Sequence, residues 1–316
     1  MKNYKITVFT PTYNRDFILE NLYRSLVNQT YINFEWVIVD DGSTDNTKQL
    51  INKWKKEKKI EIRYYYQNNL GKHVAINHGI DVARGEVFFI VDSDDWLLEK
   101  SLEIINKRLN EIPSNEKENY AGVCGLRSYP NGSIIGTTFK GDSLDTNYFT
   151  YRYEMKILGD KAEVYFTDIL KNNKFPVIKD EKILTEAIVW NRISKIYDLK
   201  YFNEVIYLCD YLNDGLSHNS FRNSLKNYKG WLLYYNELLC FKKLERSEKI
   251  KAITNYYRLG IHNHCNLYVL FKQCNNKKYS ILGILLAYPI YVRDLIMKKP
   301  LRKKNDFSRL SKNING

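Results

Sequence analysis

The sequence predicts an α/β protein with a mainly parallel central sheet flanked by helices, followed by a mostly helical region. Two observations lead to this prediction. Over the first hundred residues, short apolar and β-branched runs alternate with helical patterns, which is typical of a doubly wound, Rossmann-like sheet. After residue 213 the patterns are helical and rich in Leu, Tyr and Lys. We therefore expect one α/β domain over residues 1–212 and a basic helical region over residues 213–316.

The elements of the first domain can be placed in order along the chain. Strands are expected at residues 5–10, 35–40, 60–66 and 87–91, and helices between them at residues 17–28, 45–58 and 72–83. Ser43 or Asp45 is a suitable cap for the second helix. A Pro-Asn-Gly turn at residues 130–132 predicts a hairpin, and residues 181–196 have the pattern of a further helix.

The composition narrows the class of protein. The formal net charge of +13 favours an anionic partner: nucleic acid, an anionic membrane surface or a phosphate-bearing substrate. The five cysteines include no CxxC pair, so neither a disulfide framework nor a zinc site is indicated. The N-terminus lacks a signal-peptide pattern, and no run reaches the roughly 18–20 apolar residues that span a bilayer. We therefore expect a cytoplasmic protein.

Polar clusters follow the predicted strands, and ligands bind at the carboxyl ends of strands in sheets of this type. The strongest cluster is Asp92, Ser93, Asp94 and Asp95, directly after the fourth strand. Crowded carboxylates repel one another unless they share a cation, and Mg²⁺ and Mn²⁺ prefer oxygen ligands. The cluster therefore indicates a metal–diphosphate site. The alternative is a helix-capping loop, because acidic residues favour helix N-termini.

Three further groups stand near other strand ends. After the second strand, Asp41 can accept a hydrogen bond from a base or a ribose, and Gly42 permits a tight turn. After the first strand, Tyr13 offers a face for a base and Arg15 a cation for a phosphate. Lys72 opens a predicted helix, whose N-terminus attracts anions. Together these side chains predict a nucleotide site.

Taken together, the motifs resemble the family 2 glycosyltransferases of the GT-A fold. The similarity lies in six segments, in the order and at the spacings of the family: TPTYNR (10–15), NQTY (28–31), EWVIVDDGSTDNT (35–47), NLGKHVAINHGI (69–80), ARGEVFFIVDSDD (83–95) and TEAIVWNRI (185–193). Each segment alone is weakly specific, whereas the combination is highly specific. The resemblance implies hexosyl transfer from a nucleotide-diphosphate sugar, with UDP as the expected nucleotide, in bacterial cell-surface polysaccharide synthesis.

The resemblance also implies roles for the residues at the nucleotide. Pro11 and Tyr13 would lie against the base, and Asp41 would bind it. Lys72 would lie near the phosphates, beside the cation that Arg15 provides. These five residues would form the donor side of the site.

The same resemblance implies a metal centre for a divalent cation, Mn²⁺ or Mg²⁺. Asp92 would face the ribose and the metal, Asp94 would ligate the cation that bridges the diphosphate, and Asp95 would share that role. Some relatives carry a ligand of the metal or diphosphate in the region of His218. A lone His in a loop is more often a surface residue, and this alternative stays open.

The catalytic base is expected to be Glu186. In inverting members a carboxylate beyond the metal motif takes the proton of the acceptor hydroxyl, and Glu186 stands at the matching place. Asp180 and Glu181 are alternatives. Glu186 could instead be an acid in the first turn of a helix, where it interacts favourably with the helix dipole.

The last part of the chain lies outside the resemblance. Residues 281–292 form an apolar run that Pro289 breaks. Basic residues follow the run: Arg293, Lys298, Lys299, Arg302, Lys303 and Lys304. Such a pattern suits the surface of an anionic membrane, and the acceptor is expected to be a glycan or a lipid-linked glycan. A core helix with a solvated tail is the alternative.

Two other functions remain to be compared with glycosyl transfer. A sugar nucleotidyltransferase would carry a Gly-rich signature after its first strand, and TPTYNR contains no glycine. A non-catalytic basic protein that binds membranes or nucleic acid would not need acidic groups at two strand ends. No nucleic-acid-binding signature occurs, so we expect no nucleic-acid partner.

Overall fold

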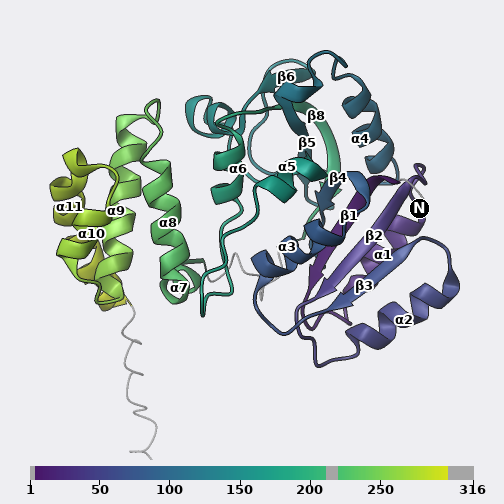
Figure 1. The fold of residues 1–316 in the computed structure, drawn as a ribbon, viewed down its shortest axis with the longest axis horizontal. Coiled ribbons are helices and arrows are strands. Elements are labelled where there is room, and N and C mark those ends of the chain that lie inside the picture. The colour runs from purple at the N-terminus through teal and green to yellow at the C-terminus, as the bar shows by residue number, and fades with distance from the viewer. Residues whose placement is uncertain (1–3, 211–219, 298–316) are drawn as a thin grey trace, which may run out of the picture.

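The computed structural model describes residues 4–210 and 220–297. At its centre is an eight-stranded sheet in the order β3-β2-β1-β4-β7-β5-β8-β6 (Figure 1). The strands are β1 (Tyr4–Thr12), β2 (Phe34–Asp40), β3 (Ile62–Tyr66), β4 (Gly85–Ile90), β5 (Tyr120–Ser128), β6 (Ser143–Thr146), β7 (Lys161–Phe166) and β8 (Asp198–Leu208). β3, β2, β1 and β4 are parallel neighbours, as predicted. β7 is antiparallel to β4 and β5, and β6 is antiparallel to β8, so this half of the sheet is mixed.

Helices cover both faces of the sheet. They are α1 (Leu19–Val27), α2 (Thr47–Glu57), α3 (Lys72–Val82), α4 (Ser101–Asn110), α5 (Thr167–Asn172) and α6 (Ala187–Ile193), with short turns η1 (Lys117–Asn119) and η2 (Thr150–Glu154). One core cluster includes Trp54 of α2, and the cluster on the other face includes Trp190 of α6. All seven residues of β2 are buried because a strand covered on both faces has no solvated side.

Five further described helices follow, and all but the first, α7, contribute to a third apolar cluster. They are α7 (Ser220–Lys226), α8 (Tyr228–Leu238), α9 (Arg246–His262), α10 (Leu267–Gln273) and α11 (Lys277–Met297). In Figure 1 they stand beside the sheet, with α8 nearest to α6. Arg192 of α6 forms an ion pair with Glu237 of α8 at 2.6 Å. The helical character of this region was predicted; the expected boundary at residue 213 lies outside the described residues.

The helix predicted at residues 181–196 is shorter, because its first turn is used elsewhere. α6 begins at Ala187. The Glu181 carboxylate instead accepts hydrogen bonds from the backbone amides of Lys229 (2.6 Å) and Gly230 (2.7 Å), at the start of α8. This contact joins elements far apart in the sequence, and no local pattern indicates it.

The prediction of the α2 cap is correct only in part: Ser43 does not bond to the helix, whereas Asp45 accepts a bond from its first amide. Asn46 occupies the N-cap position before Thr47, without a capping hydrogen bond from its side chain. Ser43 Oγ accepts instead from the backbone amide of Asn14 at 2.8 Å. Asp45 accepts from the amide of Thr47 at 3.1 Å and, through its other oxygen, from the amide of Asp16 at 3.1 Å. The two polar side chains therefore join the loops that follow β1 and β2.

The hairpin is confirmed only as a turn. Gly132 N donates to the Tyr129 carbonyl at 2.9 Å, but the returning chain makes a single bridge between Ile134 and Ser128 rather than a strand. The sheet neighbours of β5 are β7 and β8. Pairing between distant segments therefore replaces the local pairing that the turn suggests.

The apolar run near the C-terminus is part of a longer helix than expected. α11 has 21 residues and continues through Pro289, although a proline inside a helix typically costs about 3 kcal/mol. Within the described residues, α11 is the one helix long and apolar enough to cross a membrane, and 22% of its apolar window is buried. The apolar run at residues 281–292 did not predict this length, because the helix extends beyond the run into flanking polar residues.

Candidate functional site

A single cleft of about 1190 Å³ lies at the carboxyl ends of the parallel strands. Nine of the predicted site residues line it: Pro11, Tyr13, Arg15, Asp41, Lys72, Asp92, Asp94, Asp95 and Glu186. They come from the end of β1, from the segments that follow β1, β2 and β4, from the start of α3 and from the residue before α6. His218 lies outside the described residues. The fold therefore brings together groups up to 175 positions apart in the sequence, from Pro11 to Glu186.

Asp41 holds one wall of the cleft in place. Its carboxylate accepts hydrogen bonds from the backbone amides of Leu70 (2.9 Å) and Gly71 (2.8 Å). Gly71 has a φ of +106°, and a Cβ there would lie 2.3 Å from the carbonyl oxygen of Lys182. Gly42, with a φ of +89°, provides the predicted tight turn after Asp41. The two glycines allow the loops to approach closely in conformations that other residues rarely adopt.

The base-binding prediction concerns the segment at the end of β1. Pro11 is buried, whereas Tyr13 is 48% exposed and lines the cleft. Tyr13 therefore has a ring face that a planar ligand can cover. Between them, Thr12 has a buried hydroxyl without a partner among the described residues, and the sequence analysis did not single it out.

Lys72 joins two of the predicted carboxylates. Its Nζ lies 2.8 Å from Oδ1 of Asp92 and 2.9 Å from Oε1 of Glu186. Burial lowers the pKa of Lys72, but the two carboxylates outweigh this and raise it above its ordinary value. Burial likewise raises the pKa of Asp92, and Lys72 outweighs that effect so that the pKa lies below its usual range. Both groups are therefore charged at neutral pH.

Asp94 and Asp95 differ in their surroundings. Burial and the nearby Asp92 raise the pKa of Asp94, and Arg15, 3.9 Å away, opposes the rise. Asp95 is 7% exposed, and its Oδ2 accepts a hydrogen bond from Tyr207 at 2.6 Å. Burial and Asp92 raise the pKa of Asp95 to about 7. The protein therefore compensates the negative charge of the two ionised carboxylates only in part.

This donor set fits a divalent cation that the protein shares with a phosphate ligand. Hard cations favour carboxylate oxygens, and a cation at Asp94 would offset the repulsion from Asp92. Within residues 4–210 and 220–297, no group of three or more His, Cys, Asp or Glu side chains is arranged to hold a metal alone. Other ligands, such as diphosphate oxygens or water, would have to complete the coordination.

Two groups beneath the acidic loop could not be recognised from the sequence. Tyr207 Oη accepts from the Asp92 amide at 2.9 Å while donating to Asp95. Arg127 lies over the Tyr207 ring at 4.1 Å, and its Nε donates to the Lys161 carbonyl at 2.7 Å. An Arg and a Tyr inside strands belong to no recognisable motif. Only the pairing of β5 with β8 brings them under the loop.

The far wall of the cleft is aromatic and basic. Trp231 and Tyr234 come from α8, and Tyr153 comes from η2. Tyr153 and Tyr234 join their hydroxyls at 2.9 Å, and Trp231 Nε1 is buried without a partner among the described residues. Arg152, Lys156 and Lys251 also line this side.

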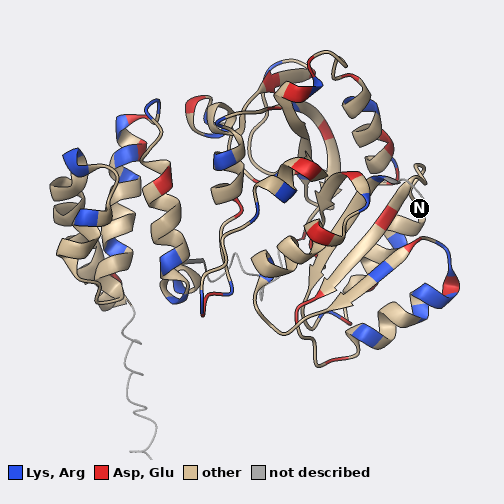
Figure 2. Cartoon of the chain, in the orientation of Figure 1, with Lys and Arg blue, Asp and Glu red and all other residues tan. Residues whose placement is uncertain are grey.

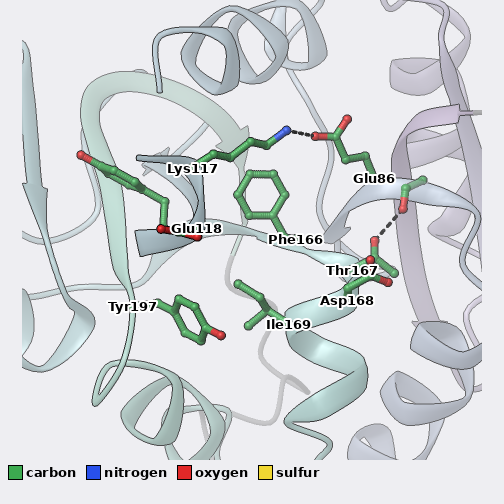
Figure 3. Close-up of a pocket in the computed structure, with 10 residues that line it drawn as sticks. Glu86, Lys117, Glu118, Phe166, Thr167, Asp168, Ile169 and Tyr197 are labelled. Atoms are coloured by element: carbon green, nitrogen blue, oxygen red, sulfur yellow. Dashed lines mark hydrogen bonds and ion pairs between the residues drawn. The ribbon is translucent and has the colours of Figure 1, made fainter. Parts of the chain in front are cut away.

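A second hollow, of about 620 Å³, lies at the opposite edge of the sheet. Figure 3 shows its lining, where Lys117 forms an ion pair with Glu86 at 2.6 Å. It contains none of the predicted site residues. Figure 2 shows Lys and Arg spread over many elements of both the sheet domain and the helical region. The helix α2 is mainly basic, with four lysines and one glutamate.

Comparison with known proteins identifies the family. The family model described as Glycosyl transferase family 2 matches residues 7–167. This chain belongs to the family 2 glycosyltransferases. The prediction of a transferase enzyme is therefore confirmed. The two alternatives, a nucleotidyltransferase and a non-catalytic binding protein, are set aside.

Two curated relatives extend the comparison. The glycosyltransferase is 27% identical over 313 residues to the GalNAc(5)-diNAcBac-PP-undecaprenol beta-1,3-glucosyltransferase of Campylobacter jejuni, covering 93% of this chain and 96% of the relative. It is 29% identical over 220 residues to Glycosyltransferase GlyA of Streptococcus pneumoniae, covering 67% of this chain and 30% of that protein.

Solved structures confirm the GT-A fold of the glycosyltransferase. TarS 1–349 of S. aureus superposes with a TM-score of 0.63 at 18% identity, covering 94% of this chain and 93% of that one. TarS 1–349 has also been solved with UDP-GlcNAc, at a TM-score of 0.60 and 19% identity over 92% of this chain and 81% of that one. The mannosyltransferase PcManGT of Pyrobaculum calidifontis, solved with GDP-Man and Mn²⁺, superposes with a TM-score of 0.55 at 17% identity, covering 93% and 80%.

Proposed function

We propose that this glycosyltransferase uses a divalent cation and a UDP-linked sugar, and transfers the sugar with inversion to a glycan or lipid-linked acceptor of the cell surface. The observation that carries the proposal is the convergence of nine predicted donor-site, metal and base residues in one cleft. Structural neighbours solved with UDP-GlcNAc and with GDP-Man and Mn²⁺ support a nucleotide-sugar donor and a divalent cation.

On the donor side, Pro11 and Tyr13 would bind the base, and Asp41 would accept a hydrogen bond from it while supporting the wall formed by Gly71. Asp94 would hold the cation, with Asp95 beside it. The bound cation would neutralise charge on the departing diphosphate. Arg15 and Lys72, which also line the cleft, would add positive charge near the phosphates.

On the acceptor side, Glu186 would take the proton of the attacking hydroxyl. The bond from the anomeric carbon to the diphosphate oxygen breaks, the acceptor oxygen bonds to that carbon from the opposite face, and UDP leaves. The proton ends on the Glu186 carboxylate. Lys72, 2.9 Å from Glu186 Oε1, would hold this carboxylate in position while also bonding to Asp92.

The acceptor is proposed to be a glycan on a lipid diphosphate. The relative from C. jejuni is named for such an acceptor. In this chain the aromatic side chains Tyr153, Trp231 and Tyr234 offer faces for sugar rings, and the basic Arg152 and Lys156 beside them suit a diphosphate. The helical region from residue 213 onward would thus complete the acceptor side of a catalytic domain formed by residues 1–212.

Peripheral attachment to the inner face of the membrane is proposed to follow from α11. Its small residues Ser280, Gly283 and Ala287 pack inward, and Asp294 accepts a bond from Arg258 of α9 at 2.6 Å. Crossing a bilayer would break this ion pair, at a cost typical of a charge left in an apolar medium. An interfacial position would keep the pair and bury only the outer face of α11.

A panel of nucleotide sugars tests the proposal. Hydrolysis of each donor is measured with Mn²⁺, with Mg²⁺ and with EDTA, and UDP affinity is measured by calorimetry in the same buffers. We expect one UDP-sugar to be hydrolysed, and both hydrolysis and UDP binding to weaken in EDTA. Equal activity in EDTA would refute the metal, and preference for a GDP- or dTDP-sugar would refute the UDP assignment.

A further inference from the structure

Glu163 is a carboxyl group of the cleft that the proposed mechanism does not use. It lies on β7 and lines the cleft. Its own backbone amide donates to its carboxylate. Within residues 4–210 and 220–297 it has no ion pair and no bond from another side chain. Glu163 is half-buried and lines the open cleft, so a ligand bound there could supply the hydrogen-bond partners that neighbouring side chains do not.

The sheet register places Glu163 in a row with a second unpaired polar group. Cys124 of β5 pairs with Glu163 on one side and with Tyr201 of β8 on the other. Paired residues point to the same face of a sheet, and the small Cys124 leaves space between its larger neighbours. Tyr201 lines the cleft and is 1% exposed, and its hydroxyl has no partner among the described residues. The Tyr165 hydroxyl, two positions along β7 on the same face, is also unpaired.

The row formed by Glu163, Cys124 and Tyr201 has charged neighbours from both the donor side and the base. Burial raises the pKa of Glu163 to about 7, Arg127 opposes the rise, and Glu186 adds to it. Arg127 also lowers the pKa of Asp92. Glu163 lines the same cleft as Arg127 and Glu186, so it shares that cleft with the residues proposed for the diphosphate and the base. In the proposed mechanism, the sugar leaves the diphosphate within this cleft.

We propose that Glu163 binds a hydroxyl group of the transferred sugar, with Tyr201 on the far side of Cys124 as a second polar contact, and so determines which donor sugar the enzyme accepts. A carboxylate accepts the hydrogen of a sugar hydroxyl, and a tyrosine hydroxyl can both donate and accept. A sugar bound here would satisfy polar groups that the protein leaves unpaired. The inference rests on the proposed function, because it needs a donor bound with its diphosphate at Asp94.

Glu163→Ala and Glu163→Gln test the inference with the preferred nucleotide sugar and its deoxy analogues. We expect Glu163→Ala to lower kcat/KM for donor hydrolysis by about 10- to 150-fold, the range for a hydrogen bond to a charged group, while UDP affinity is unchanged. With the analogue that lacks the bound hydroxyl, wild type and variant should have equal kcat/KM. Glu163→Gln keeps the volume, and should show the same selectivity with a smaller loss.

Glu86→Gln is the matched control, because Glu86 lies at the opposite edge of the sheet with ion pairs to Lys5 and Lys117. It should leave the donor preference unchanged. A loss in Glu163→Ala that is equal for the sugar and for every deoxy analogue would overturn the inference. So would a rise in acceptor KM with donor hydrolysis unaffected. If the wild-type enzyme hydrolysed no nucleotide sugar and did not bind UDP, the proposed function would fail and this inference with it.

Discussion

Nζ of Lys72 lies 2.9 Å from Oε1 of Glu186. The lysine begins α3 and the glutamate immediately precedes α6, so one ion pair joins the segment near the proposed donor to the segment near the proposed acceptor. Lys72 also contacts Asp92. A nucleotide diphosphate that drew the ammonium toward its phosphates would therefore alter the surroundings of Glu186. Separate tests of the two partners follow from this geometry.

Glu186→Gln keeps the side-chain shape and removes the proton acceptor. Transfer to an acceptor should fall by about 100-fold or more, the usual scale for loss of a general base. UDP affinity, measured by calorimetry with Mn²⁺, should change little, because the base faces the acceptor. Weaker UDP binding with unchanged turnover would instead assign Glu186 to the donor side.

Lys72→Met should affect both binding and stability. The substitution removes the ammonium group that Asp92 and Glu186 share, so two carboxylates remain close together. All three side chains are 27–29% exposed. We expect the free energy of unfolding to fall by about 1–3 kcal/mol, below the range for a fully buried pair, and the donor KM to rise. Chemical denaturation and initial rates measure the two effects. Lys59→Met, which breaks the exposed pair with Glu57, should change neither by a comparable amount; an equal effect would contradict the argument.

Asp94→Asn should separate activity from stability. Burial and the repulsion from Asp92 raise the pKa of Asp94, so without a bound cation its charge is unfavourable in the folded state. The variant should lose nearly all transfer activity, yet its thermal midpoint in EDTA should equal or exceed that of the wild type. A folded variant with full, metal-dependent activity would remove Asp94 from the metal site. A lower midpoint in EDTA would show that its carboxylate stabilises the fold.

The parallel half of the sheet could be predicted from the sequence because its signals are local. Each of the apolar runs at residues 5–10, 35–40, 60–66 and 87–91 is followed by polar residues and a helical pattern. Because parallel strands have their carboxyl ends on one side of the sheet, the polar residues after them meet there. The mixed half could not be predicted. β7 lies between β4 and β5, and no local pattern indicates pairing between segments as far apart in the chain as Phe89 and Val164. The antiparallel position of β7 is also what directs Glu163 into the cleft.

The residues of the site could likewise be predicted only where a local motif marks them. Asp92 and Asp94 belong to a motif and could be named in advance, and the resemblance indicated Glu186. Tyr207 and Arg127 lie under that motif but have no signature of their own, because their role depends on the register of β5 with β8. Aromatic residues of α8 face the cleft through contacts with α6, which no periodicity indicates.

The raised pKa of Glu163 predicts a pH-dependent stability. The ordinary value is 4.5 and the folded value about 7, so between these values the folded state keeps a proton that the unfolded state releases. Stability therefore falls as pH rises through this window, by up to about 1.4 kcal/mol per unit and about 3 kcal/mol in total. Glu163→Gln has no carboxyl group at this position, so its free energy of unfolding lacks this pH dependence. Measured without nucleotide, its stability relative to wild type should increase from pH 4.5 to 7 and then stay constant.

Glu86→Gln should behave in the opposite way. Burial raises the pKa of Glu86, but Lys117 and Lys5 outweigh it and lower the pKa below 4.5. The wild-type ion pairs therefore stabilise the fold above the ordinary value and are lost as the pH falls through the folded pKa. If both variants show the same pH dependence, the Glu163 effect is not specific to its half-buried carboxyl.

The last prediction concerns the outer face of α11. Ile281, Leu285 and Tyr288 are spaced one helical turn apart and are 69%, 66% and 62% exposed. Removal of the whole helix would also take Ala287 from the helical core, so substitution is the cleaner test. Changing the three to Asn should abolish sedimentation with anionic vesicles, because their burial in the interface provides the apolar part of the binding.

The wild-type enzyme should bind anionic vesicles more than neutral ones, and high salt should release it, because basic residues near such a surface contribute about 1 kcal/mol each. UDP binding should be unaffected by the triple substitution, which lies away from the cleft. The control replaces three exposed apolar residues of the α/β part with Asn: Ile32, Val177 and Ile196. Since these lie elsewhere on the surface, the control should sediment like wild type. Sedimentation of the α11 variant at the wild-type level would show that this face does not contact the membrane.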